Sequence, residues 1–391
     1  PDRRSKTNCG THRGRPRTRL IEEENKMRIG GGMVYGAPRA TSLLLGYGLS
    51  RRPTLRCFSA AASPSPTPSL LFPDHTEFIR DVAAIQPPKH LPHLMRMLRT
   101  RGDSIVSPGD KQGLIPLAIP LAKTSSASDW EFDLMLRIDD LIALLRWPTA
   151  PPGMEMPVVE VRKYGVWLLA KTVDQFIHRI LVEEDANLLY KGNDEIFDAA
   201  ADAGENIYTK GDFAKSQISD LDVYLLKKVG LFPDVLERKV MRHFEKGDQV
   251  SALVTGEYYT RKEHFPGFAR PFVFNSKILL KVGRTLEAKD AARGALKSPW
   301  WTLGCPYKEV AEIAEWEDEQ IEYMQERVTE DGRQQDLNKG KDPAQIVLDE
   351  AAFLLDLASI DGSWDDYLDR IVGCYKEAGL LDVARFLEYR D

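Results

Sequence analysis

Histidine and acidic residues at short spacings are the first candidates for chemistry in this sequence. His90 and His93 lie three residues apart, a spacing at which two imidazoles could share a metal ion. No cysteine, glutamate or third histidine lies close by to complete a ligand set. The sequence therefore favours surface or packing roles for this pair, and we expect no metal site.

Two acidic runs, residues 183–185 and 317–319, could in principle supply carboxylates for acid–base chemistry or for Mg²⁺. Consecutive side chains on a helix point in different directions, so such runs more often form a solvated face. The sequence also lacks the phosphate-loop patterns GxGxxG and GxxxxGK[ST], the nucleophile motif GxSxG and the zinc motif HExxH. We therefore predict no catalytic residues, no cofactor and no enzyme activity.

Length, composition and cysteine content set the class of protein. The chain has 391 residues, of which 43% are hydrophobic, so it has room for two domains with cores. Its four cysteines form no CxxC pair. Cys9 and Cys57 fall in the N-terminal region described next, and Cys305 and Cys374 are expected to be buried or half-buried thiols in a reducing compartment.

The N-terminal region has the composition of a targeting segment. Residues 1–26 are polar and basic without hydrophobic periodicity, which indicates an upstream or disordered segment. Residues 27–73 contain five arginines, many Ser, Thr and Ala, and no acidic residue, as in an organelle transit peptide and its linker. We expect a chloroplast protein, stromal or thylakoid-associated, with the mitochondrion as the alternative.

Charge is distributed unevenly along the chain. The net charge is −6, yet residues 1–70 hold 13 Lys and Arg against 4 Asp and Glu. From Glu309 onward 8 basic residues face 23 acidic ones. Because nucleic-acid binding depends on clustered Lys and Arg, no nucleic-acid partner is expected. A protein partner with a basic surface fits better.

Residues 74–192 have the pattern of a small α+β domain. Pro157–Arg162 and Val166–Ala170 flank a short Gly-containing connection, which predicts a β-hairpin. Leu141–Trp147 has strand length, and the prolines of Leu114–Lys123 fit an edge strand. From Val173 to Leu189 the apolar period becomes that of a helix. Residues 125–140 are acidic and amphipathic, and their role stays open.

Residues 193–391 are predicted to be mostly helical, because apolar residues recur there at spacings of three and four. Asp331–Lys341 reads as a polar linker. No run approaches the roughly 18 to 20 apolar residues of a membrane span, which leaves only peripheral membrane contact open. The predicted helices are Leu221–Val229, Asp234–Phe244, Val273–Val282, Leu286–Leu296, Glu309–Val328, Ala344–Ser359, Tyr367–Glu377 and Leu381–Tyr389.

Three glycines, Gly211, Gly247 and Gly283, recur at intervals of 36 residues. Each is preceded at three residues by a large residue and followed at five by a small one. A period in the mid-thirties is typical of stacked two-helix units, with the glycine ending the first helix and the small residue allowing close packing. A match of the same form, though off the period, lies around Gly379.

This pattern resembles the tetratricopeptide repeat, most closely around Leu279, Gly283, Ala288 and Ala295. The usual Trp and Tyr are replaced and the proline comes one residue early, so the motifs are degenerate and an irregular helical bundle is the alternative. The resemblance covers residues 193–304 and implies a surface that binds peptides or proteins.

The aromatic residues of this region are candidate protein-binding residues. We name four of them: Tyr258, Tyr259, Trp300 and Trp301. The sequence thus favours a non-enzymatic organellar scaffold or assembly factor that binds a protein. Two alternatives stay open: an organellar RNA-binding or processing factor, and an enzyme with a site where the β-sheet meets the helices.

Overall fold

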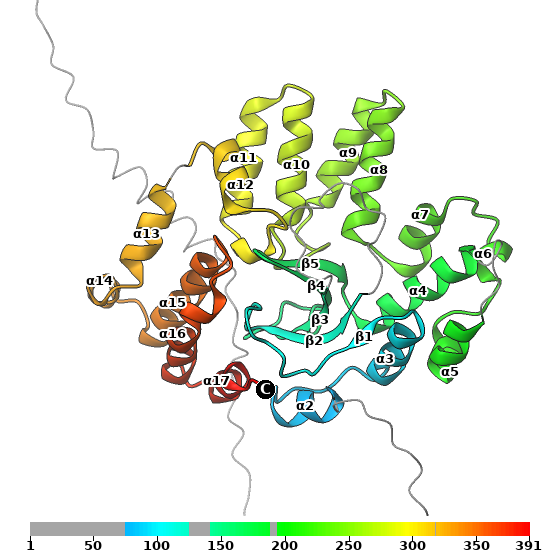
Figure 1. Ribbon diagram of the computed structural model, residues 1–391. Helices are drawn as coiled ribbons and strands as arrows, with labels where there is room; N and C mark the ends of the chain where they lie inside the picture. Colours follow the sequence, from blue (N-terminus) through cyan, green and yellow to red (C-terminus); the bar gives the residue numbers. More distant parts are fainter. Residues whose placement is uncertain (1–74, 125–140, 188–193, 317) are drawn as a thin grey trace, which may run out of the picture. The chain divides into compact units, whose positions relative to one another are not determined.

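The computed structural model describes residues 75–124, 141–187, 194–316 and 318–391. The predicted upstream segment, transit peptide and linker, and the stretch 125–140, lie outside these residues. A small antiparallel sheet in the N-terminal half is followed by a mostly helical C-terminal region (Figure 1). The predicted α+β fold class is therefore confirmed.

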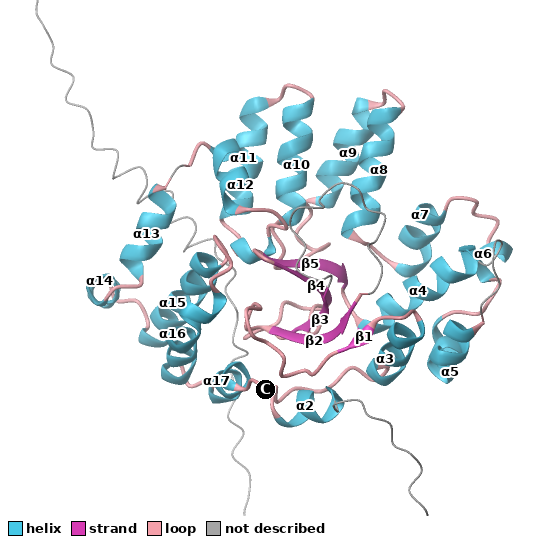
Figure 2. Ribbon diagram, viewed as in Figure 1, coloured by secondary structure: helices cyan, strands magenta, loops and turns pink. Residues whose placement is uncertain are grey.

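The sheet is a five-stranded meander in the order β1-β2-β3-β4-β5 (Figure 2). Each strand pairs antiparallel with the next one along the chain. The predicted hairpin joins β4 to β5, with Arg162 opposite Gly165, whose φ of 144° suits glycine. The strands are β1 (Ser104–Ile105), β2 (Ala118–Lys123), β3 (Leu141–Leu145), β4 (Val158–Arg162) and β5 (Gly165–Ala170).

The strand that we expected at the edge lies inside the sheet. β2 pairs with β3 on one side and with β1 on the other. Pro120 is tolerated because β1 has only two residues and does not extend as far as Pro120. No hydrogen bond between β1 and β2 therefore needs the N–H that proline lacks. The pairing of β2 with β3 also shifts register between Pro120 and Ala122.

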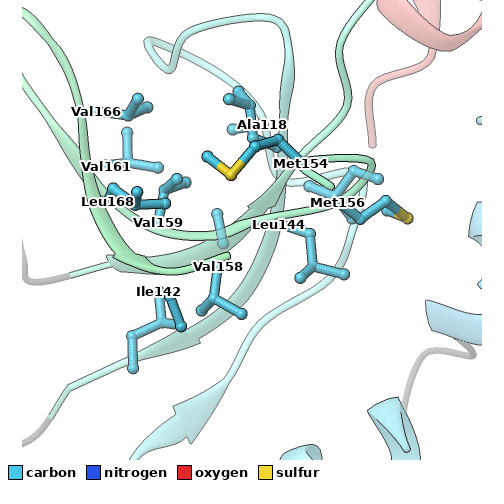
Figure 3. Packing of buried hydrophobic residues seen from close by; sticks show 14 of the residues in the cluster. Ala118, Ile142, Leu144, Met154, Met156, Val158, Val159, Val161, Val166 and Leu168 are labelled. Atoms are coloured by element: carbon cyan, nitrogen blue, oxygen red, sulfur yellow. The ribbon is translucent and has the colours of Figure 1, made fainter. Parts of the chain in front are cut away.

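The sheet is buried on both faces, which explains why its strands are apolar throughout. All five residues of β3 are buried. Figure 3 shows Ile142, Leu144 and Val158 from adjacent strands among the packed side chains, with Met154 and Met156 nearby. A single layer of helices could not cover two faces, so elements from distant parts of the sequence must contribute.

Helices occupy most of the remaining described chain. Within these residues, no helix has both the length and the apolar character needed to cross a bilayer. The helices are α2 (His75–Asp81), α3 (Leu91–Thr100), α4 (Val173–Asn187), α5 (Glu195–Ile207), α6 (Asp212–Lys215), α7 (Leu221–Tyr224), α8 (Pro233–Glu245), α9 (Gln249–Tyr259), α10 (Arg270–Lys281), α11 (Thr285–Leu296), α12 (Tyr307–Ala314), α13 (Glu319–Arg327), α14 (Glu330–Asn338), α15 (Pro343–Ala358), α16 (Trp364–Glu377) and α17 (Leu381–Glu388).

Two sequence-based helix predictions are corrected. The helix expected over Glu309–Val328 is divided into α12 and α13, since Glu315 adopts a left-handed φ of 51°. The expected polar linker Asp331–Lys341 is largely helix α14, capped by the Thr329 side chain. Helix α14 has few apolar residues, so apolar periodicity did not predict it. Ion pairs such as Arg327–Asp336 stabilise it in their place.

Glycine-ended helical hairpins are present as expected at Gly247, Gly283 and Gly379. Their φ values of 74°, 79° and 77° are left-handed, and the next residue donates a backbone hydrogen bond to the carbonyl five residues earlier. The small residues five positions on, Ala252 and Ala288, are fully buried. Around Gly211 the geometry differs, because only the four-residue helix α6 follows it.

The C-terminal helices complete the core of the N-terminal sheet domain. One cluster of buried side chains extends from Phe78 to Leu387. Helix α2 lies beside α17 (Figure 1). Phe78 of α2 meets Phe386 of α17 edge to face, with ring centres 6.3 Å apart. Arg146, directly after β3, forms a 3.0 Å ion pair with Asp382. The two ends of the described chain therefore stabilise one another.

A buried lysine also holds α17. Lys111 lies in the loop between β1 and β2, and its side chain is fully buried. Its ammonium group donates a 3.0 Å hydrogen bond to the Phe386 carbonyl oxygen and lies 3.7 Å from the centre of that ring. Burial, assisted by the nearby charge of Arg390, lowers the pKa of Lys111 to about 7.

Lys111→Met should change how stability depends on pH. The unfolded amine keeps a pKa near 10.5 and the folded one titrates near 7, so the unfolded wild type binds more protons between these values. Its free energy of unfolding should therefore rise with pH across this window, by at most ~1.4 kcal/mol per pH unit, relative to the variant. Urea unfolding of the wild type and the variant across this pH range measures the difference. If their free energies of unfolding changed with pH in parallel, Lys111 would not titrate as a buried amine.

Candidate protein-binding face

Three of the four predicted contact residues lie in the core. Trp300 is 1% exposed, its indole N–H donates to the Leu296 carbonyl oxygen and its backbone N–H donates to Asp356. Trp301 is 4% exposed and packs against Trp147, with ring centres 5.2 Å apart. Both tryptophans therefore join α11 to the sheet and to α15, and they do not form an accessible contact surface.

Tyr259 is also buried, and it belongs to a polar group at the base of the hairpins. Its hydroxyl donates to Glu237 of α8, which also accepts two bonds, of 2.9 and 2.8 Å, from Arg270 of α10. Burial and the charge of Glu237 raise the pKa of Tyr259, so the hydroxyl keeps its proton. The Arg270 guanidinium lies 4.5 Å from the ring centre of Trp167 in β5, which fixes this base to the sheet.

Tyr258 is the one predicted contact residue that reaches the surface, with 36% exposure. It shares one face of α9 with Val250 and Val254, since the three lie at successive spacings of four. These valines are 73% and 61% exposed. We call these three residues the α9 stripe, and three aligned exposed apolar side chains are unusual enough to mark an interaction surface.

The stripe faces outward because the opposite side of α9 is built from small residues. Ala252 is fully buried, and Gly256 packs so closely that an added Cβ would lie 3.0 Å from Asn275 and 3.3 Å from Ile278 of α10. Asp248 begins the helix by accepting a 3.0 Å hydrogen bond from the Ser251 N–H. Close packing on the small side leaves the larger valines in solvent.

Sequence reasoning missed both valines. Residues 249–259 carry apolar side chains on several faces, so no single stripe stood out. Helix α9 was expected only as the second helix of the Gly247 unit, without bounds or an apolar face of its own. One signal was present in the sequence: Val250 and Leu286 each lie three residues after a turn glycine and are separated by the repeat interval of 36. Both are exposed in the structure.

Several of the residues considered for metal or acid–base chemistry have structural partners, whereas Glu317 lies outside the described residues. His90 contacts Asp174 at 2.9 Å, and Glu183 pairs with Arg179. Asp185 accepts hydrogen bonds from Tyr208 and from the Gly211 N–H. Within the described ranges, no group of three or more His, Cys, Asp and Glu is placed to hold a metal ion. These contacts hold the helices together.

The two described cysteines are both buried. Burial, with the negative charge of Glu350, raises the pKa of the Cys374 thiol to about 12, so this thiol stays protonated and unreactive. Cys305 lines a very small hollow near Gly165, where the sheet meets the helices. That hollow has a volume of about 10 Å³, hardly that of one water molecule.

The junction of sheet and helices is thus filled. The Trp301 carbonyl oxygen lies so close to Gly165 that an added Cβ would be 1.9 Å away. The described residues around Gly165 are therefore closely packed at this point of the junction.

Three family models match the chain in succession. They are described as PAB N-terminal over residues 73–228, PAB middle domain over 233–317 and PAB C-terminal domain over 321–389. A relative from Arabidopsis thaliana, "Protein IN CHLOROPLAST ATPASE BIOGENESIS, chloroplastic", is 62% identical over 317 residues, which cover 81% of this chain and 91% of the relative. The chain belongs to the PAB family. No solved structure matches it.

Membership of the PAB family confirms the predicted chloroplast location, and the mitochondrial alternative is set aside. It also supports the coarser prediction of an organellar assembly-type protein. The matching models carry PAB descriptions, so the resemblance to the tetratricopeptide repeat stays a prediction.

The PAB middle segment holds the α9 stripe and is fixed to the N-terminal segment by buried ion pairs. Arg179 of α4 makes two bonds, of 2.8 and 2.7 Å, to Asp234 of α8. Arg238 bonds the same carboxylate and also Asp222. Burial alone would raise the pKa of Asp234, but the adjacent Arg179 guanidinium lowers it to about 2. The hairpins thus rest on a charged, well-paired base.

Glu237→Ala should destabilise the protein strongly, because it leaves the Arg270 guanidinium and the Tyr259 hydroxyl buried without their shared acceptor. We expect a loss of about 3 kcal/mol in the free energy of unfolding. Glu257→Ala, which removes an exposed carboxylate from α9, is the matched control and should change it by less than about 0.5 kcal/mol. Equal losses in urea unfolding would contradict this role for Glu237.

Proposed function

We propose that this protein is a non-enzymatic assembly factor that takes part in chloroplast ATPase biogenesis by binding a protein component of that enzyme. The observation that carries the proposal is the 62% identity with an Arabidopsis protein named for that process. Identity at this level extends over 81% of this chain and 91% of the relative, so the likeness is not confined to one segment.

The α9 stripe supports binding as the mode of action. Val250, Val254 and Tyr258 present apolar surface on a helix whose other side is tightly packed. Their helix stands on the buried Glu237–Arg270 pair, so the surface is held in one orientation before a partner arrives. Such preorganisation reduces the entropy lost on binding.

The acidic residues beyond Glu309 support a partner that has a basic surface. Eight Lys and Arg stand against 23 Asp and Glu in that part of the sequence. Complementary charge raises association rates and selects among partners, and it is screened by salt. The same charge disfavours the RNA-binding alternative, since phosphate backbones would be repelled.

Affinity purification of the tagged full chain from chloroplasts tests the proposal. We expect subunits of the chloroplast ATPase to co-purify, in amounts that fall as salt is raised. Mass spectrometry of the eluate gives the readout. Recovery of the chain without any ATPase subunit at low salt would contradict the proposed process.

Val254→Ser combined with Tyr258→Ser tests the stripe itself. Both positions are exposed, so the variant should fold normally and its melting temperature should stay close to that of the wild type. Recovery of the partner should fall about tenfold if these side chains are central contacts. Leu381→Ser, at an exposed apolar position on α17, is the matched control. Undiminished recovery with the double variant would exclude the stripe.

A further inference from the structure

The ends of the two middle hairpins have a repeated composition that the α9 stripe does not explain. Hairpins α8–α9 and α10–α11 turn at the same end, at Gly247 and Gly283 (Figure 1). Each glycine has an apolar residue three positions before it and another three positions after it. These residues are Phe244 and Val250 at the first turn, and Leu280 and Leu286 at the second.

Exposure of these apolar residues is high for side chains of their type. Val250 is 73% exposed and Leu286 is 80% exposed. Leu280 is 39% exposed, and Phe244 is half-buried. We call these four residues the hairpin tips. Two adjacent hairpins thus carry apolar residues at the same two positions of their turns, and three of these four residues are exposed.

A groove lies between the two hairpins, beside the tips. It has a volume of about 330 Å³ and is lined by Met241, Phe244 and Glu245 of α8, Gln249 of α9 and Lys281 of α10. The groove is therefore shared between both hairpins, and Phe244 belongs to it as well as to the tips. Its size suits the bulky side chain of a bound segment.

Charged residues of both signs lie around the groove, and two of the basic ones form no ion pair among the described residues. Lys281 lies 5.1 Å from the ring centre of Phe244. Across the described chain, Lys281 and Lys246 form no ion pair, whereas Arg284 at the second turn is paired with Glu287. Residues 233–297 as a whole contain 13 Lys and Arg against 8 Asp and Glu. The tips therefore combine apolar side chains with unpaired positive charge.

We propose that the hairpin tips bind a short amphipathic segment of a partner protein, with apolar side chains on one face and Asp or Glu beside them. Apolar side chains of that segment enter the groove and cover the tips, while its carboxylates meet Lys246 and Lys281. The inference rests on the proposed protein-binding function. It adds a second surface, opposite in charge to the acidic region beyond Glu309.

An acidic membrane surface fits this site less well. Glu245 lines the groove, and Asp248 and Glu287 lie at the two turns. A uniformly anionic headgroup layer would face all three carboxylates, whereas a peptide can place its own carboxylates beside Lys246 and Lys281 alone. The acidic helices of a second copy also fit less well. Most of their apolar residues, such as Met324 and Val347, are buried within their own fold, and the exposed Leu337 and Leu381 lie on separate helices.

Binding of labelled peptides to the purified full chain tests the proposal. The probe is a fluorescent helical peptide of Leu and Glu, roughly 14 residues long, with Leu at helical spacing. A peptide with Lys in place of Glu and one with the Leu and Glu order scrambled serve as comparisons. Fluorescence anisotropy should show salt-sensitive binding of the acidic amphipathic peptide, and weaker binding of the other two.

Two variants assign the binding to the tips. Lys246→Glu with Lys281→Glu, and separately Val250→Ser with Leu286→Ser, should each weaken binding about tenfold. Lys262→Glu and Leu381→Ser, exposed positions away from the tips, are the matched controls and should bind as the wild type does. Circular dichroism should show unchanged helix content in all four.

Several outcomes would overturn the proposal. Equal peptide binding by the wild type and both tip variants would do so, as would a preference for the Lys peptide. Binding of anionic vesicles through the same lysines, without peptide binding, would point to a membrane. A dimer that is lost in the tip variants and kept in the control variants would point to a second copy of the chain. The test is independent of the chloroplast purification. If the peptide binds at the tips but no ATPase subunit is recovered, only the proposed role in ATPase biogenesis is refuted. If ATPase subunits are recovered but the peptide does not bind at the tips, only the proposed tip site is refuted.

Discussion

The structure depends on covering both faces of a small, wholly apolar sheet. Strand β3 is buried along its entire length, and the described residues form no second sheet for the five-stranded meander to pack against. Helices from the far end of the sequence supply the missing surface, with Phe386 of α17 against Phe78 of α2. The fully buried Lys111 and the Arg146–Asp382 pair fasten the same junction. The PAB N-terminal and C-terminal segments therefore share one core.

The middle segment combines a fixed base with exposed ends. At the base, Glu237, Arg270 and Tyr259 satisfy one another in the interior, and Arg270 also packs on Trp167 of the sheet. Breaking any of these contacts would leave a buried polar group unpaired, which is costly. At the ends, apolar residues such as Leu286 meet only solvent. Rigid support beneath an uncovered apolar surface is the arrangement expected of a protein that binds another protein.

Opposite charges occupy different parts of the chain. Residues 233–297 have an excess of Lys and Arg, whereas residues from Glu309 onward have a large excess of Asp and Glu. Among the described residues, the ion pairs Lys277–Glu309 and Lys289–Glu315 connect the two parts directly. A partner that contacts both segments would bind in one orientation. Its acidic surface would be attracted to residues 233–297, and its basic surface to the residues beyond Glu309. Such orientation is useful to a factor that presents one component to another.

The sequence by itself determined most of the elements and several of the turns, although it missed the break after α12 and helix α14. Short apolar runs predicted β3, β4 and β5, and the spacing of Gly247 and Gly283 predicted the turns of both hairpins, because local geometry requires those residues there. Tertiary packing decided what each face meets. It buried Tyr259, Trp300 and Trp301 and left Val250 and Val254 exposed. Periodicity reports which side chains share a face, but burial depends on whether another element, far away in the sequence, comes to cover it.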